Sequence, residues 1–119
     1  MGRMIVKPNR EKNLYVLWSS ITDTPLMWGK RRHFLKWAKD PANWDVLSPD
    51  QIEAMLDRAD ATSSSSRIFP ESWDEDFSII YAGYGYIMNS EQEKLLEVLE
   101  LKDVDTDDPR ALALLHPFE

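Results

Sequence analysis

The chain has no cysteine, and only four of its 119 residues are glycine. Without thiols it forms no disulfide, no thiolate nucleophile and no zinc site that depends on sulfur. No apolar run approaches the roughly 18 residues that a membrane-spanning helix needs. Residues 1–12 carry four basic side chains but lack the apolar stretch of a secretory signal. We therefore expect a cytoplasmic protein that does not associate with membranes.

The sequence is also poor in catalytic signatures. No serine lies in a G-x-S-x-G turn, and His33 and His116 are the only histidines. Residues 103–107 carry aspartate at alternate positions, as an EF-hand calcium loop does at its start. However, Asp108 and Leu114 stand where that loop requires glycine and glutamate. The sequence thus predicts no metal, no cofactor and no catalytic residue, and a small metal-dependent hydrolase or nuclease is the function with the least support.

Aromatic and aliphatic residues are present in the proportion of a folded domain. Hydrophobic residues make up 43% of the chain and aromatic residues 11%, including five tryptophans. A chain of this length buries roughly two thirds of its extended surface, which is enough for one core. We expect a single domain over residues 1–119, with residues 1–12 as a flexible N-terminal arm and residues 102–119 as an acidic linker and a short C-terminal helix.

Two segments have the composition of β-strands. Residues 13–20 are apolar on both faces, which predicts a central strand. A Thr-Asp-Thr-Pro turn at residues 22–25 leads to a short returning strand at residues 26–29, so that this unit is expected to be a hairpin. Residues 77–83 form the second strand segment, and residues 84–88 extend it or form another edge.

A basic amphipathic helix is predicted over residues 30–39, ending before Pro41. Arg32, Lys36 and Lys39 recur at i, i+4 and i+7, so they share one side of this helix. Another side carries apolar residues at helical spacing, which indicates that the helix packs on a core.

A second helix is predicted to begin at Ser48, because this N-cap residue is followed by proline, an acid and glutamine. It continues to about residue 61, with Ile52 and Leu56 toward the core. The hydroxyl-rich residues 62–66 then predict a loop that is too polar to pack.

The C-terminal third contains the signals for a short strand and two more helices. Residues 68–69 predict the strand, and Ser90 with Glu93 predicts a capping box that opens a helix with inward leucines. Pro109 opens a last short helix that extends to His116 in its final turn. The predicted order is ββααββαα, an α+β fold in which a small antiparallel sheet of three to four strands packs with three to four helices.

The charges are unevenly divided along the chain. Residues 1–39 contain nine basic and two acidic side chains, a net charge of +7. Residues 40–119 contain five basic and nineteen acidic side chains, a net charge of −14. Such asymmetry indicates a charged contact surface, either toward an external partner or between the two segments themselves.

The candidate partner-binding residues are basic or aromatic. The basic ones, all within residues 30–39, are Arg31, Arg32, Lys36 and Lys39. Trp73 lies in an acidic loop and is either an interface anchor or a residue at the rim of the core. Tyr84 and Tyr86 lie on the predicted edge strand, which either pairs with a second copy in a homodimer or is covered by the C-terminal helix.

Residues 14–32, LYVLWSSITDTPLMWGKRR, resemble small uncharacterised proteins encoded by actinobacteriophages and related mobile elements. The shared pattern is a strand, two serines, a turn that ends in Pro25, and Gly29 before a basic residue. The stretch from Arg58 through the serine run to Arg67 is similar to a second block of these proteins. The resemblance implies a phage accessory protein without assigned activity, with no catalytic residues to transfer.

These observations predict a non-enzymatic protein-interaction module, a phage-encoded modulator of a host protein. The alternative is a nucleic-acid-associated accessory protein that uses the helix at residues 30–39 for phosphate contacts. The net charge of −7 argues against this alternative, because nucleic-acid-binding domains usually present net positive charge.

Overall fold

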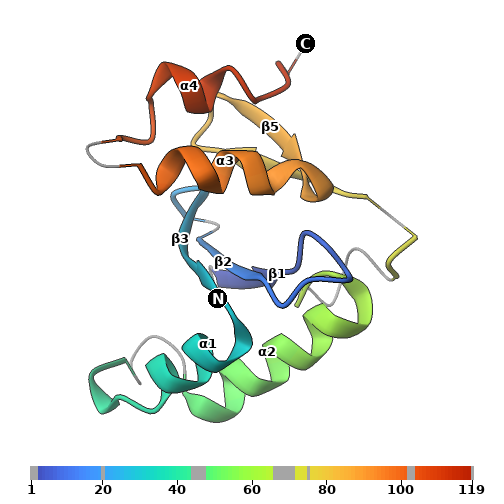
Figure 1. The fold of residues 1–119 in the computed structure, drawn as a ribbon, viewed down its shortest axis with the longest axis vertical. Coiled ribbons are helices and arrows are strands. Elements are labelled where there is room, and N and C mark those ends of the chain that lie inside the picture. Colours follow the sequence, from blue (N-terminus) through green and yellow to red (C-terminus); the bar gives the residue numbers. More distant parts are fainter. Residues whose placement is uncertain are drawn as a thin grey trace.

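A three-stranded antiparallel sheet forms the middle layer of the molecule (Figure 1). Its strands are β1 (Arg3–Val6), β2 (Tyr15–Ser19) and β3 (Thr24–Gly29), and β2 lies in the centre. The computed structural model describes residues 3–19, 21–43, 48–65, 72–74, 76–101 and 104–118.

Two helices cover one face of this sheet and lie below it in Figure 1. They are α1 (Arg31–Ala38) and α2 (Pro49–Thr62), and a short 3₁₀ turn at Pro41–Asn43 follows α1. Both helices bury their apolar sides in a cluster shared with the sheet. Its buried members are Ile5, Tyr15, Leu17, Phe34, Ala38, Ile52, Leu56 and Ala59.

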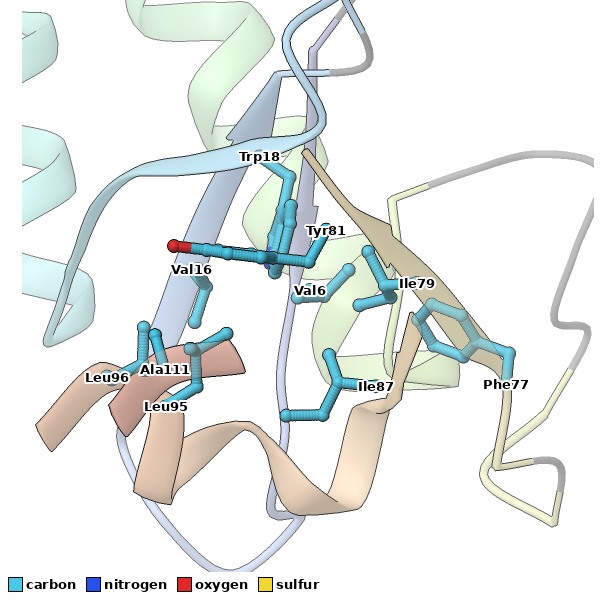
Figure 2. Packing of buried hydrophobic residues seen from close by; sticks show 10 residues of the cluster. All are labelled: Val6, Val16, Trp18, Phe77, Ile79, Tyr81, Ile87, Leu95, Leu96 and Ala111. Atoms are coloured by element: carbon cyan, nitrogen blue, oxygen red, sulfur yellow. The ribbon is translucent and has the colours of Figure 1, made fainter. Parts of the chain in front are cut away.

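The C-terminal half of the chain covers the opposite face of the sheet. It consists of the hairpin β4 (Ser78–Tyr81) and β5 (Gly85–Met88), a 3₁₀ turn at Asn89–Glu91, and the helices α3 (Gln92–Leu99) and α4 (Pro109–Leu112). Figure 2 shows the second cluster, whose buried members are Val6, Val16, Trp18, Phe77, Ile79, Tyr81, Ile87, Leu95, Leu96 and Ala111. Every helix that the structure describes is too short or too polar to cross a membrane.

Strand β2 contributes to both clusters because its side chains alternate between the two faces of the sheet. Tyr15 and Leu17 pack against α1 and α2, whereas Val16 and Trp18 point into the other layer. All five residues of β2 are buried. The predicted central strand and its hairpin with β3 are therefore confirmed.

The α+β class and the antiparallel pairing are confirmed, and one further strand precedes the predicted order. The prediction of a flexible arm at residues 1–12 is wrong for the described part, since β1 pairs with β2 and both Ile5 and Val6 are fully buried. The apolar residues of β1 form a short run flanked by basic residues, and for this reason the sequence did not predict a strand there. The strands also form a sheet of three and a sheet of two rather than one sheet.

The hydroxyl-rich run after α2 packs against β1, which corrects the prediction that it is too polar to pack. Ser63 and Ser64 are buried. The Lys7 N–H donates to the Ser63 carbonyl at 2.8 Å, and the Ser65 N–H donates to the Ile5 carbonyl at 2.8 Å. The outward backbone N–H and carbonyl groups of β1 need hydrogen-bond partners, and an extended backbone provides them even where its side chains are polar.

Helix α2 begins as its sequence predicts. The Gln51 N–H donates to the Ser48 hydroxyl at 3.3 Å, and the Ser48 N–H donates to the Gln51 side chain at 2.9 Å, which completes a capping box. The helix ends where Ser63 adopts the left-handed conformation, with φ of 80°. Ser66 and the strand predicted at residues 68–69 lie outside the described residues.

The start of α3 differs from the predicted capping box. The backbone N–H and the hydroxyl of Ser90 both donate to the carboxylate of Asp76, at 3.0 Å and 2.5 Å. Glu93 accepts a hydrogen bond from Lys12 at 2.7 Å instead of capping the helix. A distant carboxylate thus replaces the local partner of Ser90, and α3 begins at Gln92 after a 3₁₀ turn.

The last helix is shorter than its sequence predicts. Helix α4 ends at Leu112, and His116 lies beyond it rather than in its final turn. The backbones of His116 and Tyr86 exchange two hydrogen bonds, at 2.8 Å and 3.0 Å. An extended backbone is favoured over a continued helix at His116 because it forms hydrogen bonds with the outer edge of β5.

Candidate interaction surface

Helix α1 presents a basic surface to the outside because its apolar side is fixed in the core. Phe34 and Ala38, four residues apart, are fully buried between the sheet and α2. The side chains of Arg32, Lys36 and Lys39 are exposed. Two of the four predicted basic candidates, Arg32 and Lys36, therefore stand on an anchored helix, and a third, Lys39, is the residue that caps its end.

Arg31, the fourth basic candidate, is paired within the protein. Its guanidinium donates to Asp57 at 2.6 Å and to Asp60 at 3.1 Å. Lys7 donates to the same Asp60 carboxylate at 2.9 Å, and so does the hydroxyl of Tyr15 at 2.5 Å. Part of the basic third of the chain is thus neutralised by α2.

The environment of Asp60 favours its charged form. Partial burial by itself would raise the pKa of Asp60, but the hydrogen bonds from Tyr15 and Lys7 and the positive charges of Lys7 and Arg31 outweigh it. The pKa of Asp60 therefore lies below its usual range. Burial and the hydrogen bond to this carboxylate raise the pKa of Tyr15.

Arg32, Lys36 and Lys39 differ from Arg31 in having no counterion within the described structure. None of them forms an ion pair with an acidic residue that the structure describes. Exposed charges of one sign on a rigid element attract an oppositely charged surface and orient it. We refer to these three residues as the α1 basic surface.

The opposite layer of the molecule is acidic. The described residues between 72 and 118 include nine acidic and two basic side chains. Most of them belong to the layer that covers the far face of the sheet from α1 (Figure 1), whereas residues 72–74 lie near the end of α2, where Trp73 contacts Asp60. The charge division of the sequence therefore persists only in part in space. The acidic helix α2 lies beside α1, and Arg31, Lys7 and Lys12 have acidic partners within the protein.

Trp73 lies at the rim of the core. Its indole N–H donates to the backbone carbonyl of Asp60 at 2.8 Å. The guanidinium of Arg10 lies 5.9 Å from the centre of its ring, a cation–π distance. Both the polar atom and a face of the ring are thus engaged within the protein.

Tyr84 and Tyr86 have different surroundings. Tyr84 is 53% exposed in the turn between β4 and β5. Tyr86 stacks on the His116 ring with 5.1 Å between ring centres, and Phe118 lies beyond at 6.5 Å. An added Cβ at Gly85 would lie 2.6 Å from the His116 carbonyl, so glycine is needed for this close approach. The C-terminal segment, and not the predicted helix, covers this edge.

A groove of about 690 Å³ lies between the loop after β1, the helix α3 and the segment after α4. Its polar lining includes Asn9, Lys12, Glu91, Glu93, Lys94 and Glu97. Lys12 is paired with Glu93 at 2.7 Å, and the His116 Nε2 lies 2.8 Å from Glu91. The hydrogen bond with His116 lowers the pKa of Glu91. Within the described part of the chain, no group of three or more His, Asp or Glu side chains could hold a metal ion.

Sequence reasoning missed Asp60, the residue that pairs with Arg31. Its three side-chain partners lie 53, 45 and 29 residues away in the sequence, so no local motif announces them. The one available signal was an acidic pair, Asp57 and Asp60, at i and i+3 on the predicted helix. Two carboxylates at this spacing lie on the same side of a helix, which indicates that a basic residue from elsewhere in the chain packs beside them.

The fold and the surface define a three-layer α+β protein with a basic helical surface on one side and an acidic layer on the other. No family model, no curated protein and no solved structure matches the chain.

Proposed function

We propose that this protein is a non-enzymatic interaction module that docks the α1 basic surface on an acidic surface of a partner protein. The observation that carries the proposal is that Arg32, Lys36 and Lys39 are exposed, without a described counterion, on α1 or at its C-cap, while the other side of this helix is buried. Because the helix is already ordered, docking costs little backbone entropy. The resemblance of residues 14–32 to actinobacteriophage proteins supports the further proposal of a phage-encoded modulator of a host protein.

A protein partner is favoured over a nucleic acid by the charge of the whole molecule. The net charge is −7, and the neighbouring helix α2 exposes Asp50, Glu53 and Asp57, which add a negative field beside the α1 basic surface. A nucleic acid extends far beyond three phosphate contacts, so it would meet that field along much of its length. A partner protein needs only one acidic patch of matching size.

The experiment compares the wild type with a triple charge reversal, Arg32→Glu, Lys36→Glu and Lys39→Glu. Each protein is immobilised and exposed to an actinobacterial lysate at about 150 mM salt, and the retained proteins are quantified by mass spectrometry. We expect a specific host protein whose retention falls about tenfold or more in the triple variant. Lys94→Glu reverses an exposed charge on α3 and should leave retention unchanged. Equal retention by wild type and triple variant would contradict the proposal.

A second measurement separates the two classes of partner. Fluorescence anisotropy with mixed-sequence DNA and RNA should show no binding at micromolar protein and about 150 mM salt. Binding with a steep salt dependence that disappears in the triple variant would replace the protein partner with a nucleic acid.

A further inference from the structure

The two strands of the β4–β5 hairpin differ in what lies along their outer edges. Along β5, Tyr86 exchanges two backbone hydrogen bonds with His116, which closes that edge. Along β4, the Ala82 N–H donates to the Asp23 carbonyl at 2.8 Å, just after the strand ends. Within the strand, no described residue supplies a backbone partner on that side.

The register of the hairpin determines which groups of β4 face outward. In an antiparallel pair, successive residues direct their backbone groups alternately toward and away from the neighbouring strand. The Phe77 carbonyl accepts from the Asn89 N–H at 2.8 Å, so Phe77 and Ile79 face β5. Ser78 and Ile80 therefore direct an N–H and a carbonyl each toward the outside, and Ala82 follows the same alternation.

The edge is short, with four residues, but its sequence lacks the other features that usually protect an edge strand. The sequence of β4 is Ser-Ile-Ile-Tyr, without charge, proline or a bulge. The Ile80 side chain is 48% exposed beside the open backbone groups. An uncharged strand with open donors and acceptors is a template for another strand.

We propose that β4 is a self-association edge, at which two copies pair antiparallel about a two-fold axis beside Ile79. In this register Ser78 of each copy lies opposite Ile80 of the other. The two N–H and two carbonyl groups that each copy leaves open are then all bonded, as four hydrogen bonds between the copies. A register centred on Ile80 would instead need the Ala82 N–H, which Asp23 already occupies.

A second copy is the occupant that this pattern fits. The open groups of β4 are self-complementary under a two-fold axis, and an identical uncharged strand brings no like-charge pair into the joint. Asp74 and Asp76 precede the strand, and each copy carries a net charge of −7. The copies therefore repel one another at long range, and added salt should strengthen the association by screening that repulsion.

Sedimentation velocity over about 10 μM to 1 mM protein tests the proposal. We expect the mass to rise from 13.9 kDa toward twice that value with concentration, and to rise further at higher salt. Ile80→Lys should weaken the association about tenfold or more, because it places a charge in the joint. The matched control is Leu26→Lys on β3, where the replaced side chain is 47% exposed, and it should associate like the wild type. Circular dichroism verifies that both variants are folded.

Hydrogen exchange locates the contact independently of the variants. The amides of Ser78 and Ile80 should become protected as the protein concentration rises, whereas the Tyr86 amide, already bonded to His116, should not change. A mass of 13.9 kDa at every concentration and salt would overturn the proposal. The proposal would also be overturned if Leu26→Lys lost association as much as Ile80→Lys does. It would be overturned too if only amides outside β4 became protected as the protein concentration rises. The triple variant of the α1 basic surface should still associate, so this proposal and the proposed function fail separately.

Discussion

Asp60 receives side-chain hydrogen bonds from three parts of the molecule. Lys7 follows β1, Tyr15 lies in β2 and Arg31 begins α1. Since Asp60 lies near the end of α2, this one carboxylate links both helices of the lower layer to the sheet. It also decides which basic residues stay available to a partner, because Arg31 is held internally while Arg32 is not.

Acid should destabilise the protein in part through Asp60. Its pKa is lowered in the folded state, whereas an unfolded aspartate titrates at about 3.9. The stabilisation by the carboxylate is therefore complete above the unfolded pKa and is lost as the pH falls through the folded pKa. In urea unfolding from about pH 7 to about pH 3, the free energy of unfolding should fall less steeply for Asp60→Asn than for the wild type. Parallel profiles would show that Asp60 contributes nothing to the pH dependence.

Gln92 is a second residue whose role depends on distant partners. It is fully buried at the start of α3, where its carbonyl oxygen accepts from the Trp18 indole at 2.8 Å. Its amide nitrogen donates to Asn89, and the Asn89 amide donates to the Lys7 carbonyl at 3.0 Å. This buried chain of hydrogen bonds joins α3 to the sheet, because each buried polar group needs a partner.

Helix α2 is the element in which local signals and tertiary packing agree. The capping box at Ser48 fixes its start, and Ile52, Leu56 and Ala59 recur at the spacing of one helical face. All three are fully buried in the cluster beneath the sheet. The helix was predictable because its cap and its apolar period lie within the same few turns.

Leu56→Ala should lower the free energy of unfolding by about 2 to 5 kcal/mol, through lost burial and the cavity it leaves. Urea or thermal unfolding measures the change. The control is Glu53→Ala on the exposed side of α2, which should alter stability by no more than about 0.5 kcal/mol. An unchanged melting temperature for Leu56→Ala would show that this side of α2 does not face the core.

In the segment after α4, the local sequence and the tertiary structure favour different conformations. Nothing in the sequence between Leu112 and His116 breaks a helix, and a helix was expected to continue. Instead the backbone of His116 pairs with Tyr86, and its ring is held between Tyr86 and Glu91. An open strand edge with specific side-chain contacts outweighs a small helix propensity.

Across the whole molecule, the two clusters share one sheet. Val16 and Trp18 belong to one cluster, and Tyr15 and Leu17 belong to the other. If β2 unfolds, both clusters therefore lose buried residues. The rings of Trp18 and Tyr81 meet edge to face with 6.4 Å between their centres, which ties the hairpin to the sheet (Figure 2). A shared central strand predicts cooperative unfolding.

Unfolding in urea should therefore be a single transition. Tryptophan fluorescence and far-ultraviolet circular dichroism should give coincident curves with one midpoint. Leu56→Ala in the lower layer and Leu95→Ala in the upper layer should each shift both signals together. Two separate transitions, or a variant that shifts only one signal, would mean that the layers unfold independently.

The sequence by itself determined the α+β class, the β2–β3 hairpin, the basic helix and the capped helix α2. Each of these follows from apolar periodicity, turn residues or a cap within a few neighbouring positions. For the candidate surface, the helical spacing also placed Arg32, Lys36 and Lys39 on one side of the helix predicted over residues 30–39.

Only the tertiary structure decided that Arg31 is paired with Asp57 and Asp60, and that β1 belongs to the sheet. It also decided that the segment around His116 pairs with β5, whereas no residue that the structure describes pairs with the outer edge of β4. These outcomes depend on partners tens of residues apart, which meet only after the layers have packed. The backbone groups of a strand edge form hydrogen bonds with any backbone that the fold brings beside them. In the same way, a charged side chain pairs with an opposite charge that the fold brings near. The local sequence does not specify either choice, because every residue except proline carries the same backbone donor and acceptor, and the partner of a charged side chain depends on where the fold places it.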